Sequence, residues 1–262
     1  MDIQQQRRFK ILVLGDGCTD IYLFGKCDRI SPEAPVPIFK KTKESKKKGM
    51  SLNVAENLKG LGNKISVDHN SENIKKIRLI DEVSGQHVVR IDIEPDLNSF
   101  DDKKYNKGSL SKFDALVISD YDKGYITPDK IRNVLSVTAK LKIPVFVDSK
   151  KEDLSCFEGC VIKINEKEYK KIKRLPRRRQ LVVTMGKEGC QWRRRIFPAV
   201  ETEVHDVCGA GDTFLAGLVH MYLTTKGDMV KSIKFANKCA AINVRHLGTY
   251  TITQEDLNDI RD

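Results

Sequence analysis

Short runs of apolar, often β-branched residues recur along the chain, and each is bounded by polar residues or glycine. Because these runs are continuously apolar rather than alternating, they predict parallel strands that are covered on both faces of a sheet. Six such strands are expected, at Ile11–Leu14, Ile65–Val67, Leu116–Ile118, Val145–Val147, Val161–Ile164 and Leu181–Val183.

Apolar residues at helical spacing occupy the intervals between these runs. The predicted helices cover Ser51–Leu61, Thr127–Leu141, Phe214–Leu223 and Ile233–Val244. Thr127 followed by Pro128 is typical of a helix start, with the threonine hydroxyl as cap and proline in the first turn. The alternation of strand and helix predicts an α/β fold with a mostly parallel sheet flanked by helices.

Two segments break this alternation. Ile21–Phe39 carries three prolines, and Arg78–Ile93 has the pattern of a hairpin with a turn near Ser84 and Gly85. We expect both to belong to a small antiparallel sheet, a lid that spans about residues 19–43 and 78–95. No repeat or long low-complexity linker divides the chain, so residues 1–262 are expected to form a single domain.

Composition narrows the class of protein. The chain has 262 residues, 40% of them hydrophobic, and no apolar run approaches the roughly 20 residues of a membrane helix. The N-terminus has no signal-peptide pattern, and seven scattered cysteines suit free thiols in a reducing compartment, so we expect a cytoplasmic protein. Cys156 and Cys160 have the spacing of one helical turn, but no second pair or nearby histidine completes a zinc site.

The net charge of +11 includes basic clusters at Lys40–Lys48, Arg177–Arg179 and Arg193–Arg195. Such a charge suits nucleic acid, an anionic small substrate or solubility alone. The arginine clusters contain no interleaved aromatic residues, which argues against a surface for single-stranded nucleic acid. For Lys40–Lys48 we expect a solvated loop rather than a substrate-phosphate site.

Polar residues follow several of the predicted strands. Ligands of open parallel sheets bind beyond the carboxyl ends of the strands, so these residues predict a site at that edge. They are Gly15-Asp16, Ser119-Asp120, Asp148–Lys150, Asn165–Glu168 and Thr184–Gly186.

The stretch HDVCGAGDTFLAG, His205–Gly217, adds a candidate for the chemistry. Small residues lead into a helix that begins near Asp212, where unpaired N–H groups and the helix dipole favour a phosphate. Asp212 is placed there to take a proton from an attacking hydroxyl, as phosphoryl transfer requires. A tight turn with Asp212 as a helix cap is the alternative from this stretch alone. Neither a Walker A loop nor a complete G-x-G-x-x-G occurs.

DVCGAGDTFLAGLV, Asp206–Val219, closely resembles the signature of the ribokinase-like (PfkB) carbohydrate kinases, and further motifs of that family follow its order along the chain. The supporting motifs are G-D-x-x-x-D at Gly15–Asp20, N-x-x-E at Asn165–Glu168 and TMGKEG at Thr184–Gly189. CDRISPEAPVPIFK, SDYDKGYIT, VDSK and HLGTYTIT are most similar to kinases of D-glycero-D-manno-heptose 7-phosphate. The resemblance implies transfer of the γ-phosphate of ATP to an anomeric hydroxyl.

The resemblance also implies a role for each matched residue. Asp212 would be the catalytic base, with Gly209, Ala210 and Gly211 as the anion hole. The sugar would contact Asp16, Asp20, Gly49, Asn53 and Lys123. ATP would contact Lys150, Asn165, Thr184, Gly186, Gly189 and Asn237, and Mg²⁺ would be held through water by Asn165 and Glu168. The resemblance further implies a monovalent cation and a homodimer formed through the lid. For Lys123 and Lys150, the alternative to a binding role is a charged side chain in solvent at the surface.

The chain departs from the family pattern at two places. In GMSLN, Met50 stands where the family usually has a second glycine, and we expect it to narrow the sugar pocket. After Asp68 the chain passes almost directly into the Arg78 hairpin, which predicts a shortened sheet edge. Two alternatives stay open: a PfkB kinase for another sugar, and a catalytically weakened member that binds a ligand, nucleic acid or protein.

Overall fold

The computed structural model describes residues 8–253, 255 and 256, and its main sheet contains all six predicted strands. The strand order is β12-β11-β10-β9-β8-β7-β1-β4, with parallel pairing from β10 through β4 and antiparallel pairing for β11 and β12. The strands are β1 (Lys10–Gly15), β4 (Lys64–His69), β7 (Ala115–Asp120), β8 (Val145–Ser149), β9 (Val161–Asn165), β10 (Gln180–Thr184), β11 (Cys190–Trp192) and β12 (Arg195–Phe197). Among the described residues β4 ends this sheet, at the edge that was expected to be short.

The four predicted helices are present. They are α1 (Ser51–Gly60), α3 (Pro128–Leu141), α5 (Ala210–Thr224) and α6 (Met229–Asn243), and the short helices are α2 (Lys107–Leu110) and α4 (Glu166–Tyr169). Thr127 is the N-cap residue of α3, but its side chain makes no capping hydrogen bond, so that part of the prediction was wrong. Cys156 and Cys160 lie in a non-helical segment, so the single helical turn considered for them was also wrong.

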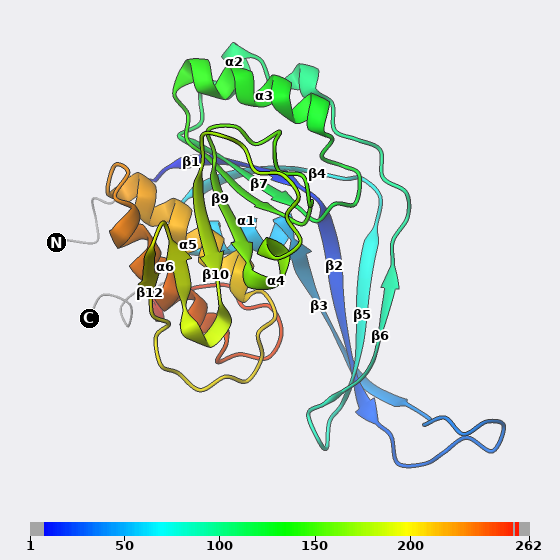
Figure 1. Ribbon diagram of the computed structural model, residues 1–262. Coiled ribbons are helices and arrows are strands. Elements are labelled where there is room, and N and C mark those ends of the chain that lie inside the picture. The colour runs from blue at the N-terminus through cyan, green and yellow to red at the C-terminus, as the bar shows by residue number, and fades with distance from the viewer. Residues whose placement is uncertain (1–7, 254, 257–262) are drawn as a thin grey trace.

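Alternating residues of the central strands enter two separate cores. Ile11 and Val13 of β1 pack with α1, α5 and α6 on one face, whereas Leu12 and Leu14 pack with α3 on the other. Figure 1 shows these helices on opposite sides of the sheet. Burial on both faces is the reason why the strands read as unbroken apolar runs. No helix within the described part of the chain is long and apolar enough to cross a membrane.

A second sheet, the lid, projects from the main body (Figure 1). Its order is β3-β2-β5-β6, formed by β2 (Gly17–Lys26), β3 (Lys40–Met50), β5 (Ile74–Asp81) and β6 (His87–Ile93). The pairings of β2 with β3 and of β5 with β6 are antiparallel, as expected, whereas β2 pairs with β5 in parallel. Lys40–Lys48 is not a loop, because it pairs with β2 over the length of the strand.

Candidate functional site

A cavity of about 920 Å³ opens at the carboxyl ends of β8, β9 and β10 and at the start of α5. Its volume lies in the usual range of small-molecule sites. All six residues expected to contact ATP line it: Lys150, Asn165, Thr184, Gly186, Gly189 and Asn237. The catalytic candidates Gly209, Ala210, Gly211 and Asp212 line the same cavity. The structure therefore gathers both groups around one space.

The glycine-rich loop before α5 is closely packed. Gly209 is the N-cap residue and has φ 79°, a left-handed conformation that favours glycine. A β-carbon on Gly209 would lie 2.9 Å from Asn53 Nδ2, and one on Gly211 would lie 2.7 Å from Lys163 Nζ. The small residues thus let the start of α5 reach the cavity beside an amide and an ammonium group, where the helix dipole favours an anion.

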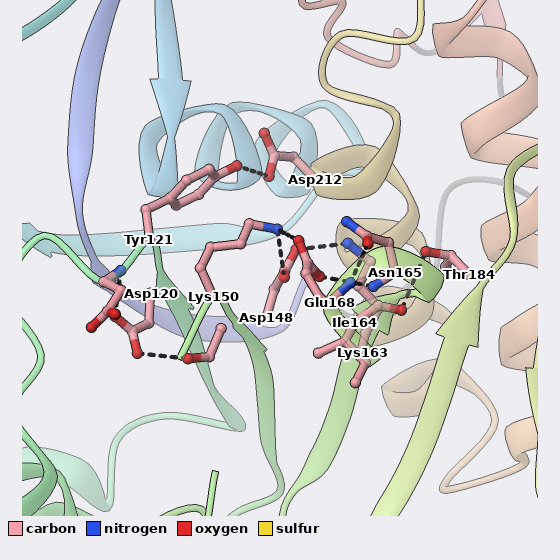
Figure 2. Close-up of polar contacts among 12 residues, drawn as sticks. Asp120, Tyr121, Asp148, Lys150, Lys163, Ile164, Asn165, Glu168, Thr184 and Asp212 are labelled. Carbon is pink, nitrogen blue, oxygen red and sulfur yellow. Dashed lines mark hydrogen bonds and ion pairs between the residues drawn. The ribbon is translucent and has the colours of Figure 1, made fainter. Parts of the chain in front are cut away.

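Asp212 lies buried in the first turn of α5 with both carboxylate oxygens engaged. Asn53 Nδ2 donates to Oδ2 at 2.9 Å. The Tyr121 hydroxyl donates to Oδ1 at 3.0 Å, as Figure 2 shows. Burial raises the pKa of Asp212 to about 6, against the lowering effect of the hydrogen bond from Asn53. A carboxylate with a pKa near the working pH is suited to accept a proton in catalysis.

Two lysines share the carboxylate of Asp148 at the cavity wall. Lys163 Nζ lies 2.7 Å from Asp148 Oδ2, and Lys150 Nζ lies 3.4 Å from Oδ1. Lys150 also forms an ion pair with Glu168 (Figure 2). Burial alone would lower the pKa of Lys150, but the charges of Asp148 and Glu168 raise it. The ammonium group of Lys150 is therefore positive at neutral pH and suited to a phosphate group.

Asn165 and Glu168 form the capping box of α4. Asn165 Oδ1 accepts from the backbone N–H of Glu168 at 2.9 Å, and Glu168 Oε2 accepts from that of Asn165 at 2.8 Å. Within the described part of the chain no cluster of three or more histidine, cysteine or acidic residues could hold a metal ion. A metal ion at this site would need further ligands besides these side chains, such as nucleotide phosphates and water.

The residues expected to contact sugar lie outside the lining of this cavity. They are Asp16, Asp20, Gly49, Asn53 and Lys123. Asp20 is buried in an ion pair with Arg78, and a β-carbon on Gly49 would collide with the Asp20 carboxylate at 2.1 Å. The ammonium group of Lys123 forms an ion pair with Glu94 at 2.5 Å.

Asp16 is fully buried at the end of β1. Its Oδ2 accepts from the backbone N–H of Tyr121 at 2.6 Å, whereas its Oδ1 has no hydrogen-bond partner among the described residues. Burial, and next the charge of Asp120, raise the pKa of Asp16 to about 6. A buried oxygen without a partner costs stability, so a donor from a bound ligand would satisfy it.

Met50 has a backbone conformation that suits glycine. Its φ is 58° and its ψ is −132°, a region in which side chains are strained. The side chain is buried with Cys18 and Ile74, and Leu97 and Tyr121 pack against this cluster. The methionine thus occupies the junction of the lid with the end of β7.

Sequence reasoning missed two residues of this region, Tyr121 and Lys163. Lys163 is the one charged residue in the strand VIKIN, which the apolar pattern predicts without regard to it. A lysine in such a strand is itself a signal, because a buried ammonium group requires a partner. Tyr121 follows the acidic end of β7 but gave no local signal, since its contact with Asp212 spans 91 positions of sequence.

The chain is similar in sequence to known proteins over most of its length. A family model described as pfkB family carbohydrate kinase matches residues 54–256. The chain is 32% identical to the bifunctional protein HldE of Campylobacter curvus over 97% of this chain and 65% of that protein. It is 33% identical to the HldE of a Nitratiruptor species over 95% of this chain and 64% of that protein. The chain therefore spans about 65% of the length of these relatives.

Solved structures share the fold at lower identity. Phosphofructokinase-2 from Escherichia coli, in complex with potassium, superposes with a TM-score of 0.74 at 16% identity, covering 97% of both chains. Arabidopsis thaliana ribokinase, complexed with ribose and ATP, has a TM-score of 0.70 at 14% identity, covering 97% of this chain and 99% of that one. The fold is ribokinase-like, and the chain belongs to the pfkB family of carbohydrate kinases.

Proposed function

We propose that this carbohydrate kinase transfers the γ-phosphate of ATP to the anomeric hydroxyl of a heptose 7-phosphate or a similar sugar phosphate. The position of Asp212 carries the proposal, because a buried carboxylate with a raised pKa stands at the start of a helix, in a cavity that Lys150 and Lys163 also line. A heptose as the acceptor is supported by the motifs in the lid and loops, such as CDRISPEAPVPIFK and HLGTYTIT, and by the similarity to the bifunctional HldE proteins.

In this mechanism Asp212 accepts the proton of the acceptor hydroxyl while the hydroxyl oxygen attacks the γ-phosphorus atom. The bond from that phosphorus to the β–γ bridging oxygen breaks, and ADP leaves with the electron pair. Lys150, Lys163 and the start of α5 stabilise the negative charge that spreads over the phosphoryl oxygens. Thr184, Gly186, Gly189 and Asn237 would line the remainder of the nucleotide site.

The acidic groups near the cavity fit a magnesium ion delivered with ATP. Mg²⁺ is commonly bound by one or two carboxylates, nucleotide phosphates and several waters. Asp148 and Glu168 supply such carboxylates, and both currently neutralise Lys150. Asn165 would assist through water. A monovalent cation remains a prediction from the family resemblance, and a potassium complex of phosphofructokinase-2 belongs to the same fold.

The acceptor sugar would bind on the side of Asp16 and Asn53. The unpartnered Oδ1 of Asp16 can accept a hydrogen bond from a sugar hydroxyl. Asn53 connects this side to the base, because its Nδ2 donates to Asp212 Oδ2 at 2.9 Å. Asp20, Gly49 and Lys123 would complete that side from the lid and the loop after β7. Met50 favours a second candidate, a kinase of the same family for a different acceptor, because its buried side chain occupies the junction next to these groups.

The outer face of the lid supports a homodimer. Val89, Ile91 and Ile93 of β6 are 45–47% exposed and share a face of the sheet with Ile77 of β5 through the register Ile77↔Ile91. A second copy of the chain would bury this apolar face. We expect sedimentation to give a dimer mass for the wild type and a monomer mass for Ile91→Lys, and a wild-type monomer at all concentrations would contradict the proposal.

The function is tested by ADP release from MgATP across a panel of sugars that includes heptose 7-phosphate, ribose and fructose 6-phosphate. We expect turnover with one phosphorylated sugar and its loss, by a factor of about 10²–10⁴, in Asp212→Asn. Asp129→Asn is the matched control, because this carboxylate is 96% exposed at the start of α3. If the protein is folded and binds ATP but phosphorylates none of the sugars in the panel, the weakened, ligand-binding alternative is favoured.

A further inference from the structure

We propose that Tyr121 is a gate for the acceptor sugar, whose phenol hydroxyl occupies Asp212 in the sugar-free enzyme and is displaced by the hydroxyl to be phosphorylated. The inference rests on the proposed function, since it treats Asp212 as the base. It adds a specificity-determining residue that links sugar binding to access to this base.

The contact between Tyr121 and Asp212 mimics the one that a substrate would make. The phenol donates to Asp212 Oδ1 at 3.0 Å, as an acceptor hydroxyl must do before it loses its proton. Asn53 already holds the other oxygen of this carboxylate, which is only 5% exposed. Tyr121 therefore covers the oxygen that is not held by the protein core, and Figure 2 shows its hydroxyl directed at that oxygen.

Tyr121 also separates the open cavity from the buried sugar-side residues. Its side chain lines the cavity, while its backbone N–H donates to Asp16 Oδ2 at 2.6 Å. On the side of the lid, the cluster of Met50, Cys18 and Ile74 packs against it. Movement of this one ring would connect the nucleotide cavity to the space beside Asp16.

Two cations hold the ring in its present position. Lys76 Nζ of the lid and Lys150 Nζ of the nucleotide side each lie 5.3 Å from the ring centroid, a distance typical of cation–π contacts. A sugar phosphate that attracts Lys76 and a nucleotide phosphate that attracts Lys150 would weaken both contacts together. The gate would then open when both substrates are present.

The expected consequence is protection against wasteful hydrolysis. Burial and the charge of Asp212 raise the pKa of the Tyr121 phenol, so the group remains a hydrogen-bond donor at neutral pH. While it donates to Asp212, water has no access to this oxygen and does not attack bound ATP. A sugar hydroxyl takes over the contact and receives the phosphoryl group.

Tyr121→Phe tests the gate because it removes only the hydroxyl. We expect sugar-independent hydrolysis of MgATP to rise by about tenfold, the sugar KM to fall by roughly fivefold and kcat to change less than about threefold. Tyr105→Phe is the matched control, since it also removes a tyrosine–carboxylate contact, to Asp68, away from Asp212. A lower kcat with unchanged KM and unchanged hydrolysis would instead make Tyr121 a positioning residue and overturn the gate.

Hydrolysis without sugar also separates this inference from the assignment of the substrate. If no sugar in the panel is phosphorylated but Tyr121→Phe hydrolyses ATP faster than wild type, and Asp212→Asn in the same background abolishes the gain, the gate stands and the sugar assignment fails. If one sugar is phosphorylated and Tyr121→Phe neither hydrolyses ATP nor lowers KM, the function stands and the gate fails. Thermal unfolding and ATP binding of each variant verify that it is folded.

Discussion

The two halves of the site differ in how far they are formed. The nucleotide half is an open cavity of about 920 Å³ whose lining includes Thr184, Gly186 and Asn237. The sugar half is closed, because Asp16, Asp20 and Asn53 are each no more than 4% exposed. The open half is built on strand ends and helix starts of the main sheet, whereas the closed half lies where the lid joins it.

This difference indicates which half of the site must move when its substrate binds. Elements of the main sheet are held by cores on both faces, so a nucleotide meets a surface that exists before it binds. The carboxylates of Asp16 in the sugar half and of Asp212, which lies between the two halves, have pKa values raised to about 6. Such buried carboxylates lower the stability of the fold, but they provide groups that a bound substrate can contact.

The largest expected effect is a loss of stability caused by a substitution in the open half. Lys163→Met leaves the buried carboxylate of Asp148 without its 2.7 Å partner, and the loss of one member of a buried pair costs about 3–5 kcal/mol. We expect a corresponding fall in the free energy of unfolding measured by urea denaturation. Lys170→Met is the control, because its ion pair with Glu166 is exposed and worth at most about 1 kcal/mol. Equal stabilities of the two variants would contradict the buried role of Lys163.

A pH profile tests the carboxylates of Asp212 and Asp16. Because Asp212 must be deprotonated to accept a proton and its pKa is raised to about 6, kcat/KM should fall about tenfold for each pH unit below 6 and level off above it. Asp16 also has a pKa of about 6, so the same profile is measured for Asp16→Asn. If the fall of kcat/KM below pH 6 persists in Asp16→Asn, it belongs to Asp212. If kcat/KM of the wild type is constant from pH 5 to 8, a base with a pKa of about 6 is excluded.

The smallest expected effect concerns the backbone at Met50. Met50→Gly and Met50→Ala remove the same buried side chain, but only glycine suits φ 58° and ψ −132°. We expect the glycine variant to be more stable than the alanine variant by about 1–2 kcal/mol in chemical denaturation. Both variants should lower the sugar KM if the methionine narrows the pocket. An alanine variant as stable as the glycine variant would show that the backbone is unstrained.

The lid shows why part of the fold escaped prediction. The six core strands were predicted because residues such as Val13 and Leu14 face different cores and are both apolar. Lys40–Lys48 has no apolar pattern, since it forms a largely exposed strand that is held by backbone hydrogen bonds to β2. A strand defined by its partner rather than by its own side chains has no periodic signal.

The sequence by itself determined the local parts of the site. The glycines before Asp212, the start of α5 and the Asn165–Glu168 capping box depend on residues within a few positions, and local sequence specifies such conformations. Only the tertiary structure decided that Asn53 and Tyr121 hold Asp212 across 159 and 91 positions. These contacts, and the burial that raises the pKa of Asp212, depend on how the lid, sheet and helices pack, which no local pattern encodes.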